Sequence, residues 1–200
     1  MNYLQDKVVL ITGAGKGAGR ALALAFAERE AVVAANDISP INVEQVVAEI
    51  VARDRKAKAY IEDVAKKVGA QSLVNSVEDD FGRIDILVNH AAVEPHTSLL
   101  DMDEWDWHRT LDVNLTGAFL MIQSTGRMMK EKGKGEILNI VTGSGRGGDK
   151  DAAAYLSSMA GLAALSNQAG RELSPHGIRV YAIENSENVV QDVMSALEAE

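Results

Sequence analysis

The feature that most constrains this chain is a run of glycines near its first residues, Thr12-Gly13-Ala14-Gly15-Lys16-Gly17-Ala18-Gly19. Residues 7–11 before it form a short apolar run rich in β-branched side chains, and residues 20–30 after it have helical composition. Glycine permits a sharp turn with positive φ and lets backbone N–H groups approach an anion at a helix N-terminus. A strand, a glycine loop and a helix in this order indicate a phosphate-binding turn. The alternative interpretation is a glycine-rich turn without a ligand.

The remainder of the chain alternates between strand and helix patterns. Further strands are expected over residues 31–37, 58–61, 84–89, 136–141 and 178–183. Helices are expected from Pro40 after an N-cap at Ser39, from an N-cap at Asp63 to about Phe81, from an N-cap at Asp103 to Lys132 with a bend near Gly117, over 152–174 and over 189–197. Strict alternation predicts an α/β fold, a three-layer Rossmann-type doubly wound parallel sheet of about six strands, with ligands at the carboxyl ends of the strands. We expect residues 1–200 to form one domain.

Composition excludes several classes of function. The formal net charge of −9 leaves too few basic residues for a nucleic-acid surface. The first residues do not show the basic region followed by an apolar region that is typical of a secretory signal peptide, and no apolar run is long enough to cross a bilayer. We therefore expect a cytoplasmic protein without a membrane partner. The chain contains no cysteine and its four histidines lack metal-ligand spacing, so no metal site is predicted. Trp105 and Trp107 are interpreted as packing residues at the start of a helix, with the alternative that the loop before them lines the mouth of a substrate site.

Motifs in a fixed order extend the pattern beyond the glycine loop. They are Thr12-Gly13 with Gly17 and Gly19, Asp63-Val64, Leu87-Val88-Asn89, Asp112-Val113-Asn114, Asn139-Ile140, Tyr155, Arg171-Glu172-Leu173 and residues 175–180. On these motifs, from residue 5 to about residue 183, the chain resembles the classical short-chain dehydrogenase/reductase family. The resemblance implies hydride transfer between a carbonyl and an alcohol with a nicotinamide dinucleotide, assisted by general acid–base catalysis.

The resemblance also implies which residues would act. In the family a Tyr exchanges the proton, a Ser polarises the substrate oxygen and an Asn supports a water-linked proton path. A Lys four residues after the Tyr lowers the Tyr pKa and holds the nicotinamide ribose. The matching residues here are Tyr155, Thr142 and Asn114, with Ser144 close to the Thr position. The Lys position is occupied by Met159.

Met159 is the decisive departure from the family pattern. Residues 155 and 159 are i and i+4 on one helix, so the uncharged thioether is expected beside the phenol. A tyrosine with an ordinary pKa near 10 is only ~0.1% ionised at pH 7. If the family Lys lowers the pKa of the Tyr by about three units, its absence removes ~4 kcal/mol of stabilisation of the ionised phenol. We therefore expect strongly reduced activity. Lys150 and Arg146 are the nearest upstream cations, and a solvated loop is the simpler interpretation of both.

The cofactor prediction depends on Asp37, which lies eighteen residues beyond Gly19 at the end of the second expected strand. A carboxylate there can accept hydrogen bonds from both ribose hydroxyls of NAD. The 2′-phosphate of NADP would meet a like charge there, and the repulsion would disfavour its binding by ~1–4 kcal/mol. A turn carboxylate is the alternative interpretation. Lys16 is a feature of NADP-binding family members, but the exclusion by Asp37 is direct, so we predict NAD. The other family-matched cofactor positions are Thr12, Gly13, Gly15, Lys16, Gly17, Ala18, Gly19, Asp63, Val64, Asn89 and Ala91.

Other positions also depart from the family pattern. Glu30 stands where a helix-ending glycine is expected, and a left-handed conformation there is on the order of 1 kcal/mol less favourable than for Gly. Ala18 replaces an Ile, His90 and Ala92 alter an Asn-Asn-Ala-Gly pattern, and Asn185-Ser186 replaces Pro-Gly. Only seventeen residues follow Ile183, whereas family members continue through a substrate-covering segment and a seventh strand.

Two classes of function follow from these residues. One is an NAD-dependent oxidoreductase with impaired activity on a small carbonyl or alcohol substrate. The other is a catalytically silent dinucleotide-binding protein, either a sensor or an inactive subunit; a structural subunit that binds no dinucleotide is a third hypothesis. The helix after Tyr155 is apolar or small nearly all round, which favours cover by a second subunit and hence a homodimer or homotetramer.

Overall fold

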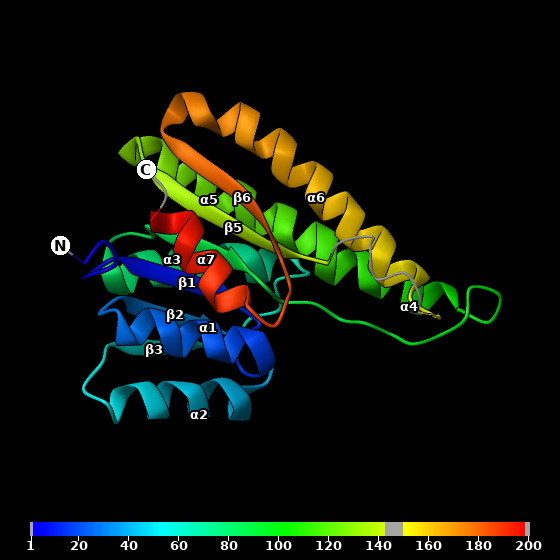
Figure 1. The fold of residues 1–200 in the computed structure, drawn as a ribbon, viewed down its shortest axis with the longest axis horizontal. Coiled ribbons are helices and arrows are strands. Elements are labelled where there is room, and N and C mark those ends of the chain that lie inside the picture. Colours follow the sequence, from blue (N-terminus) through cyan, green and yellow to red (C-terminus); the bar gives the residue numbers. More distant parts are fainter. Residues whose placement is uncertain (1, 143–149, 199–200) are drawn as a thin grey trace.

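The computed structural model describes residues 2–142 and 150–198 and shows a parallel sheet between two layers of helices (Figure 1). In this part of the chain the strands are β1 (Val8–Thr12), β2 (Val32–Asn36), β3 (Ala57–Tyr60), β4 (Ile86–Asn89), β5 (Gly135–Val141) and β6 (Ile178–Glu184). They lie in the order β3-β2-β1-β4-β5-β6, and every neighbouring pair is parallel. The predicted Rossmann-type doubly wound sheet of about six strands is therefore confirmed. The strand order reverses between β1 and β4, which is where such sheets bind their ligands, at the carboxyl ends of the strands.

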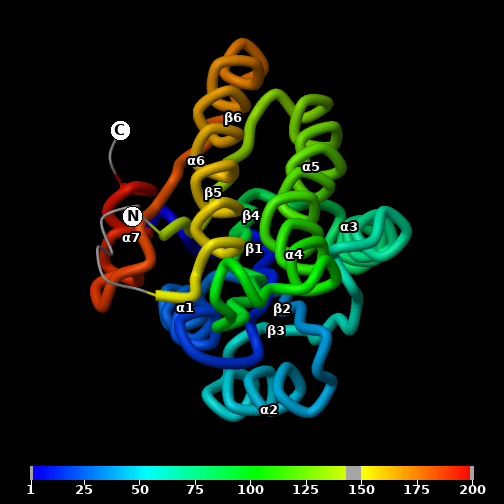
Figure 2. The backbone as a smooth tube through the Cα atoms, turned by 90° about the vertical axis from the view of Figure 1, so that its right-hand side faces the viewer, coloured from blue at the N-terminus to red at the C-terminus, as the bar shows by residue number. Residues whose placement is uncertain are grey.

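Helices cover both faces of the sheet. They are α1 (Gly17–Glu28), α2 (Pro40–Val51), α3 (Lys67–Phe81), α4 (Glu104–Leu111), α5 (Ala118–Lys132), α6 (Ala153–Leu173) and α7 (Val189–Glu198). A π-helix, η1 (Asp112–Gly117), joins α4 to α5, and a short 3-10 turn, η2 (Ser174–His176), follows α6. Side chains of α1, α2 and α7 share one apolar cluster, and those of α3, α5 and α6 share the other. Figure 2 shows α1 and α7 on one side of the sheet and α3 and α5 on the opposite side.

The central strands are apolar on both faces, which is why they lie between two layers. In β1, Val9 and Ile11 belong to the cluster of α1 and α2, whereas Val8 and Leu10 belong to the cluster of α3 and α5. All of β1 is buried. Burial of one such side chain contributes about 1.5–3 kcal/mol, so the strand that precedes the glycine loop is firmly held.

Three helix starts test the predicted N-caps. Ser39 lies at the N-cap position of α2 and Pro40 is its first residue, as predicted, although the Ser39 side chain forms no capping hydrogen bond. Asp103 caps α4 as predicted, because its Oδ1 accepts a hydrogen bond from Asp106 N at 2.7 Å. The cap predicted at Asp63 is wrong: α3 begins at Lys67, and Asp63 Oδ1 accepts from Ala65 N at 3.1 Å in a turn before the helix. A carboxylate that bonds the N–H two residues further on forms an Asx turn, and this local bond competes with a helix start.

Helix geometry departs from ideal in two predicted places. The bend expected near Gly117 is a π-helix, whose hydrogen bonds span one more residue than those of an α-helix. Glu30 adopts the left-handed conformation expected of it, with φ of 66°, and its carboxylate pairs with Arg55 at 3.2 Å. The left-handed conformation of Glu30 is on the order of 1 kcal/mol less favourable than it would be for glycine, and the residue adopts it nevertheless.

A buried carboxylate ties the first residues of the chain to the amino ends of the strands. Glu136 at the start of β5 is only 4% exposed. Tyr3 Oη donates to Glu136 Oε2 at 2.6 Å, Arg179 at the start of β6 pairs with Oε1, and Lys7 Nζ lies 3.7 Å from Oε2. Burial, aided by the hydrogen bond to Glu136, raises the pKa of Tyr3 to about 12, so this phenol remains a donor at neutral pH.

Removing this carboxylate should destabilise the fold. In Glu136→Ala, two cations and a phenol lose their shared partner, and we expect the free energy of unfolding to fall by about 2–3 kcal/mol. The value is below that of a fully buried pair because the Arg179 side chain is 42% exposed. Urea unfolding followed by circular dichroism measures the change. The control is Glu44→Ala, at an exposed position of α2, which should stay within about 0.5 kcal/mol; equal losses in both variants would contradict the role of Glu136.

Candidate functional site

The glycine loop lies at the carboxyl end of β1 and leads directly into α1. Gly13 has φ of 66°, and a Cβ on it would lie 2.7 Å from Ala91 Cα. A Cβ on Gly19 would lie 2.1 Å from the carbonyl oxygen of Gly13. Gly17, by contrast, has open space around it and requires glycine only for its φ of 55°. The loop is therefore closed tightly at both ends and open at Gly17, the first residue of α1, where the free N–H groups of a helix begin.

Asp37 follows β2 and is held in place by the backbone on both of its oxygens. Its Oδ2 accepts a hydrogen bond from Gly15 N at 2.9 Å, and its Oδ1 accepts one from Ser39 N at 2.9 Å. A Cβ on Gly15 would lie 2.7 Å from Oδ2, so this close approach also requires glycine. The carboxylate thus lies beside the glycine loop, and each of its oxygens keeps a further lone pair for a ligand.

A groove of about 580 Å³ runs along this edge of the sheet. Of the predicted cofactor residues, its lining includes Gly13, Lys16, Asp37, Asp63, Val64 and Ala91. Thr12 and Asn89 line a smaller cavity that shares Val64, Ala91 and Val113 with the groove, and Gly15, Gly17, Ala18 and Gly19 shape the loop. The structure brings these residues together from the carboxyl ends of β1 and β4 and from the segments that follow β1, β2, β3 and β4.

One wall of the groove was missed by sequence reasoning. Trp105, His108 and Arg109 of α4 line it together with the glycine loop. Trp105 is 65% exposed, and the Arg109 guanidinium lies 5.3 Å from its ring centre. The interpretation of Trp105 as a packing residue is therefore wrong, whereas Trp107 is half-buried. The signal available in the sequence was the i, i+3, i+4 spacing of the three side chains, which places them on one helix face.

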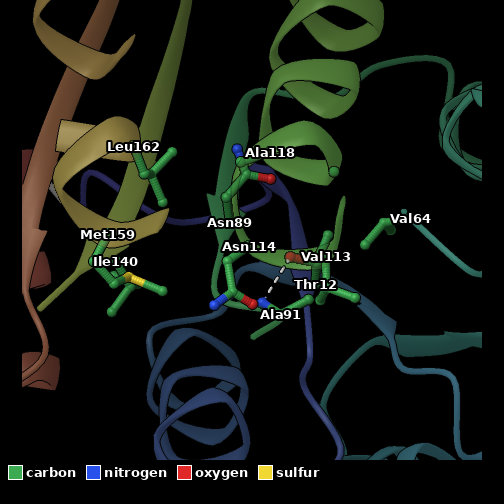
Figure 3. A pocket seen from close by; sticks show the side chains of 11 residues that line it. Thr12, Val64, Asn89, Ala91, Val113, Asn114, Ala118, Ile140, Met159 and Leu162 are labelled. Atoms are coloured by element: carbon green, nitrogen blue, oxygen red, sulfur yellow. Dashed lines mark hydrogen bonds between the residues drawn. The ribbon is translucent and has the colours of Figure 1, made fainter. Parts of the chain in front are cut away.

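The ends of β1 and β4 are joined through polar side chains. Thr12 Oγ1 accepts a hydrogen bond from His90 N at 3.1 Å. It accepts a second one from Ala91 N at 3.2 Å (Figure 3). Asn89 Nδ2 donates to Asn139 Oδ1 at 2.8 Å, whereas Asn89 Oδ1 is buried and has no partner among the described residues. The segment after β4 is thereby fixed against the glycine loop.

The hydroxyl groups of Tyr155 and Thr142 lie next to each other. Their hydroxyl oxygens lie 2.7 Å apart, and both residues are buried. Thr142 directly follows β5, and Tyr155 lies in the first turn of α6, so the pair stands at the carboxyl edge of the sheet. Ser144 and Arg146 lie outside the described residues. Lys150 is exposed and forms no hydrogen bond or ion pair within residues 2–142 and 150–198.

Asn114 holds the segment after β4 against α6. Its Oδ1 accepts from Val93 N at 2.8 Å, and its Nδ2 donates to Val93 O at 3.0 Å and to Ser158 Oγ at 2.9 Å. Ser158 Oγ in turn donates to the carbonyl oxygen of Tyr155 at 2.6 Å. Both Asn114 amide protons are therefore engaged in hydrogen bonds, one with the Val93 carbonyl oxygen and one with Ser158 Oγ. Sequence reasoning missed Ser158, although its place one residue before Met159 puts it on the same helix turn.

Met159 occupies an uncharged environment. It is 3% exposed and lines a cavity of about 10 Å³, roughly the room that one water molecule needs. Figure 3 shows Met159 and Leu162 of α6 on one side of this cavity and Val64 and Val113 on the other. None of the eleven lining residues carries a charge. Among the described residues that line this cavity, none replaces the cation that the family pattern places at position 159.

The described part of the chain offers neither a metal-binding cluster nor a membrane-spanning helix. Residues 2–142 and 150–198 contain no group of three or more His, Asp or Glu side chains that could hold a metal ion. The helices over the same ranges are too short or too polar for any of them to cross a membrane. The cytoplasmic location stays a prediction from the sequence.

A parallel sheet in this strand order, with a groove at its crossover edge, defines the Rossmann class of nucleotide-binding proteins. Within that class the chain belongs to the short-chain dehydrogenase/reductase family, since the family model for short chain dehydrogenases matches residues 7–192. The resemblance noted in the sequence is thereby confirmed. The family is one of oxidoreductases that bind a nicotinamide dinucleotide.

This chain matches more than two thirds of the length of each of the following relatives. A 3-oxoacyl-[acyl-carrier-protein] reductase of Synechocystis sp. is 36% identical over 184 residues, which is 92% of this chain and 74% of the reductase. The structure of NAD+-bound xylitol dehydrogenase has a TM-score of 0.86 at 34% identity and covers 90% of this chain and 70% of that one. A metagenomic short-chain oxidoreductase in complex with NADP has a TM-score of 0.93 at 27% identity, covering 99% and 93%. Because relatives with NAD and with NADP both match, the choice of dinucleotide has to be argued from this chain's own residues.

Proposed function

We propose that this protein is an NAD(H)-dependent oxidoreductase that interconverts a small carbonyl compound and a secondary alcohol, with low turnover. The observation that carries the proposal is the buried pair of hydroxyls on Tyr155 and Thr142, 2.7 Å apart at the same sheet edge as the groove. When one hydroxyl donates to the other, one proton remains that can be directed at a substrate oxygen. A donor at this place can protonate the oxygen of a carbonyl during its reduction.

The residues present fit the adenosine and diphosphate parts of a dinucleotide. The clash that a Cβ would cause at Gly13 and Gly19 marks a loop shaped for close backbone approach, and the N-terminus of α1 suits an anion. Asp37 would accept hydrogen bonds from the two adenosine ribose hydroxyls, and it would repel a 2′-phosphate by ~1–4 kcal/mol. Asp63 and Val64 would border the adenine, and Asn89 and Ala91 would brace the adjoining segment. The dinucleotide, when bound, supplies or takes the hydride.

The chain's own residues would divide the remaining work. Tyr155 would exchange the proton with the substrate oxygen, and Thr142 would polarise that oxygen. Asn114 would hold the position of Tyr155 through Ser158. The uncharged cavity around Met159 supports low turnover, because no cation there favours the ionised phenol.

The same cavity favours a second candidate, a catalytically silent dinucleotide-binding protein that acts as a sensor or an inactive subunit. Met159 removes the cation but leaves the glycine loop and Asp37 unchanged, so binding and turnover can be separated. For either candidate we propose a homodimer or homotetramer. Ala160 and Ala164 are exposed on α6, and Phe119 on α5 is 42% exposed. Small and apolar residues on neighbouring helices favour close packing with a second copy.

Calorimetric titration with NADH and NADPH, followed by a turnover assay, tests the proposal. We expect NADH to bind at least tenfold more tightly than NADPH. We also expect slow oxidation of xylitol with NAD+ or slow reduction of a 3-oxoacyl thioester or simple ketone with NADH. Binding of NADH without turnover on a broad alcohol and ketone panel would favour the silent candidate. Absence of binding to either dinucleotide would contradict both and leave a structural subunit.

A further inference from the structure

His90 lies directly after β4 and lines the groove beneath the glycine loop. Its ring nitrogen Nδ1 is 3.2 Å from the carbonyl oxygen of Gly13. The same nitrogen is 2.7 Å from the place that a Cβ on Gly19 would occupy, and 3.2 Å from that of a Cβ on Gly13. The imidazole therefore fills the space that the two glycines leave open on this side of the loop.

The chemistry of the two groups decides which tautomer is present. A carbonyl oxygen only accepts, so the hydrogen bond requires the proton on His90 Nδ1. Burial lowers the pKa of His90 below its ordinary value of 6.5, with the Gly13 carbonyl and the Asp37 carboxylate opposing the shift. The ring is thus neutral at pH 7, with Nδ1 protonated and Nε2 bare.

The partner of His90 is half of a peptide unit that is also held at its other end. The Gly13 carbonyl and the Ala14 N–H belong to the same peptide plane, and Ala14 N donates to Asn36 O at 2.8 Å. The N–H of this peptide plane is held by Asn36 of β2, and its carbonyl oxygen is held by His90 after β4. A flip of this plane would rotate ψ of Gly13 and φ of Ala14, and glycine at position 13, without a Cβ, restricts its own ψ little. A flip would reverse the dipole of the first peptide in the phosphate-binding turn.

We propose that His90 is a positioning residue of the dinucleotide loop, whose Nδ1–H donates to Gly13 O and fixes the Gly13–Ala14 peptide plane for binding of the diphosphate. The role rests on the proposed dinucleotide binding and adds a residue to it. It also explains why a histidine can stand where the family pattern has Asn. The Asn Nδ2 and the His Nδ1 are the same number of bonds from Cβ, so both can present an N–H to the same carbonyl.

Three variants separate the hydrogen bond from the bulk of the ring. His90→Phe keeps a ring and removes the donor, His90→Asn keeps a donor and removes the ring, and His90→Ala removes both. We expect the Kd for NADH to rise about tenfold in His90→Phe and His90→Ala, and to stay within about threefold in His90→Asn, since one hydrogen bond is at stake. The Kd for adenosine, which has no phosphate, should be unchanged in all three. Melting temperatures identify any variant that is merely unfolded.

An independent measurement tests the hydrogen bond without any ligand. In 15N-correlated NMR spectra of the unaltered protein at pH 7, we expect His90 Nδ1 to be protonated and Nε2 to be unprotonated. An Nε2–H tautomer would overturn the proposal. So would unchanged NADH affinity in His90→Phe, or equal weakening in His90→Asn and His90→Phe. If the unaltered chain binds no NADH at all, the proposed function fails and the ligand role of His90 falls with it, whereas failure confined to the variants overturns this inference alone.

Discussion

Replacing Met159 with lysine is expected to raise turnover by about two to three orders of magnitude, because it would place an ammonium one helical turn from the phenol of Tyr155. An opposite charge at such a distance favours the ionised form of a phenol by about one to three pKa units. Each unit corresponds to about 1.4 kcal/mol, or a factor of ten, if the whole shift is realised in the transition state. The effect should be largest for alcohol oxidation, in which the phenolate accepts the proton.

The cavity around Met159 is suited to receive this change. Asn89 and Asn114 both line it, and Asn89 Oδ1 is buried without a hydrogen-bond partner among the described residues. An ammonium there would find a buried acceptor that now has none, which offsets part of its desolvation. The cavity provides only about 10 Å³ of free space, so the longer side chain has to follow the path of the thioether.

Met159→Lys should be assayed across pH, with NADH affinity measured in parallel. Met159→Gln is the matched control, since it has similar length and polarity but no charge. We expect kcat to rise in the lysine variant only, and the pH at which oxidation reaches half its maximum to fall by one unit or more. No gain in the lysine variant, with NADH binding intact, would show that the defect lies elsewhere in the site and would favour the silent dinucleotide-binding protein.

The second large effect is expected at Asp37. In Asp37→Ser the two ribose hydroxyls lose a charged acceptor, and hydrogen bonds to a charged group contribute about 1.5–3 kcal/mol. The affinity for NADH should fall by about 10- to 100-fold. The affinity for NADPH should fall less or rise, because the repulsion of the 2′-phosphate disappears with the carboxylate. The preference for NADH over NADPH should therefore shrink by at least tenfold.

Two companion variants divide the causes of this change. Asp37→Asn keeps the size and one oxygen acceptor, so a loss similar to that of Asp37→Ser would identify charge as the cause. Lys16→Gln removes the cation that also lines the groove, and we expect it to weaken NADPH more than NADH. Calorimetric titration with both dinucleotides provides all the values. An unaltered ratio of NADH to NADPH affinity in Asp37→Ser would contradict the NAD assignment.

The alternation of strands and helices could be predicted because each signal is local. The glycine loop, the apolar strands and the N-cap at Asp103 depend on neighbours within a few residues, and a short window of sequence contains them. Asp63 was mistaken for an N-cap because a carboxylate can bond a backbone N–H in an Asx turn as well as at a helix start. Sequence composition does not distinguish these two uses.

The parts that could not be predicted depend on contacts between distant segments. Tyr3 and Glu136 are 133 residues apart, and no periodicity links them. The hydrogen bond between His90 and the Gly13 carbonyl depends on how β4 lies beside β1, which only the folded sheet defines. Trp105 was interpreted as a packing residue at a helix start, yet of the residues of α4 only Thr110 is buried. Local sequence patterns were therefore sufficient to predict the helices and strands, whereas the orientation of side chains could be seen only in the tertiary structure.

The π-helix between α4 and α5 has a consequence for the register of the whole segment. One extra residue in a helical turn rotates everything beyond it by about 100° relative to an uninterrupted α-helix. This rotation allows Trp105 and Arg109 of α4 to line the groove while Met121 of α5 faces the sheet. Deleting any single residue within 112–117 would return the segment to α-helical winding. Either Trp105 and Arg109 would then turn away from the groove, or Met121 would turn away from the sheet. The length of this segment is therefore as constrained as the identity of Asn114 within it.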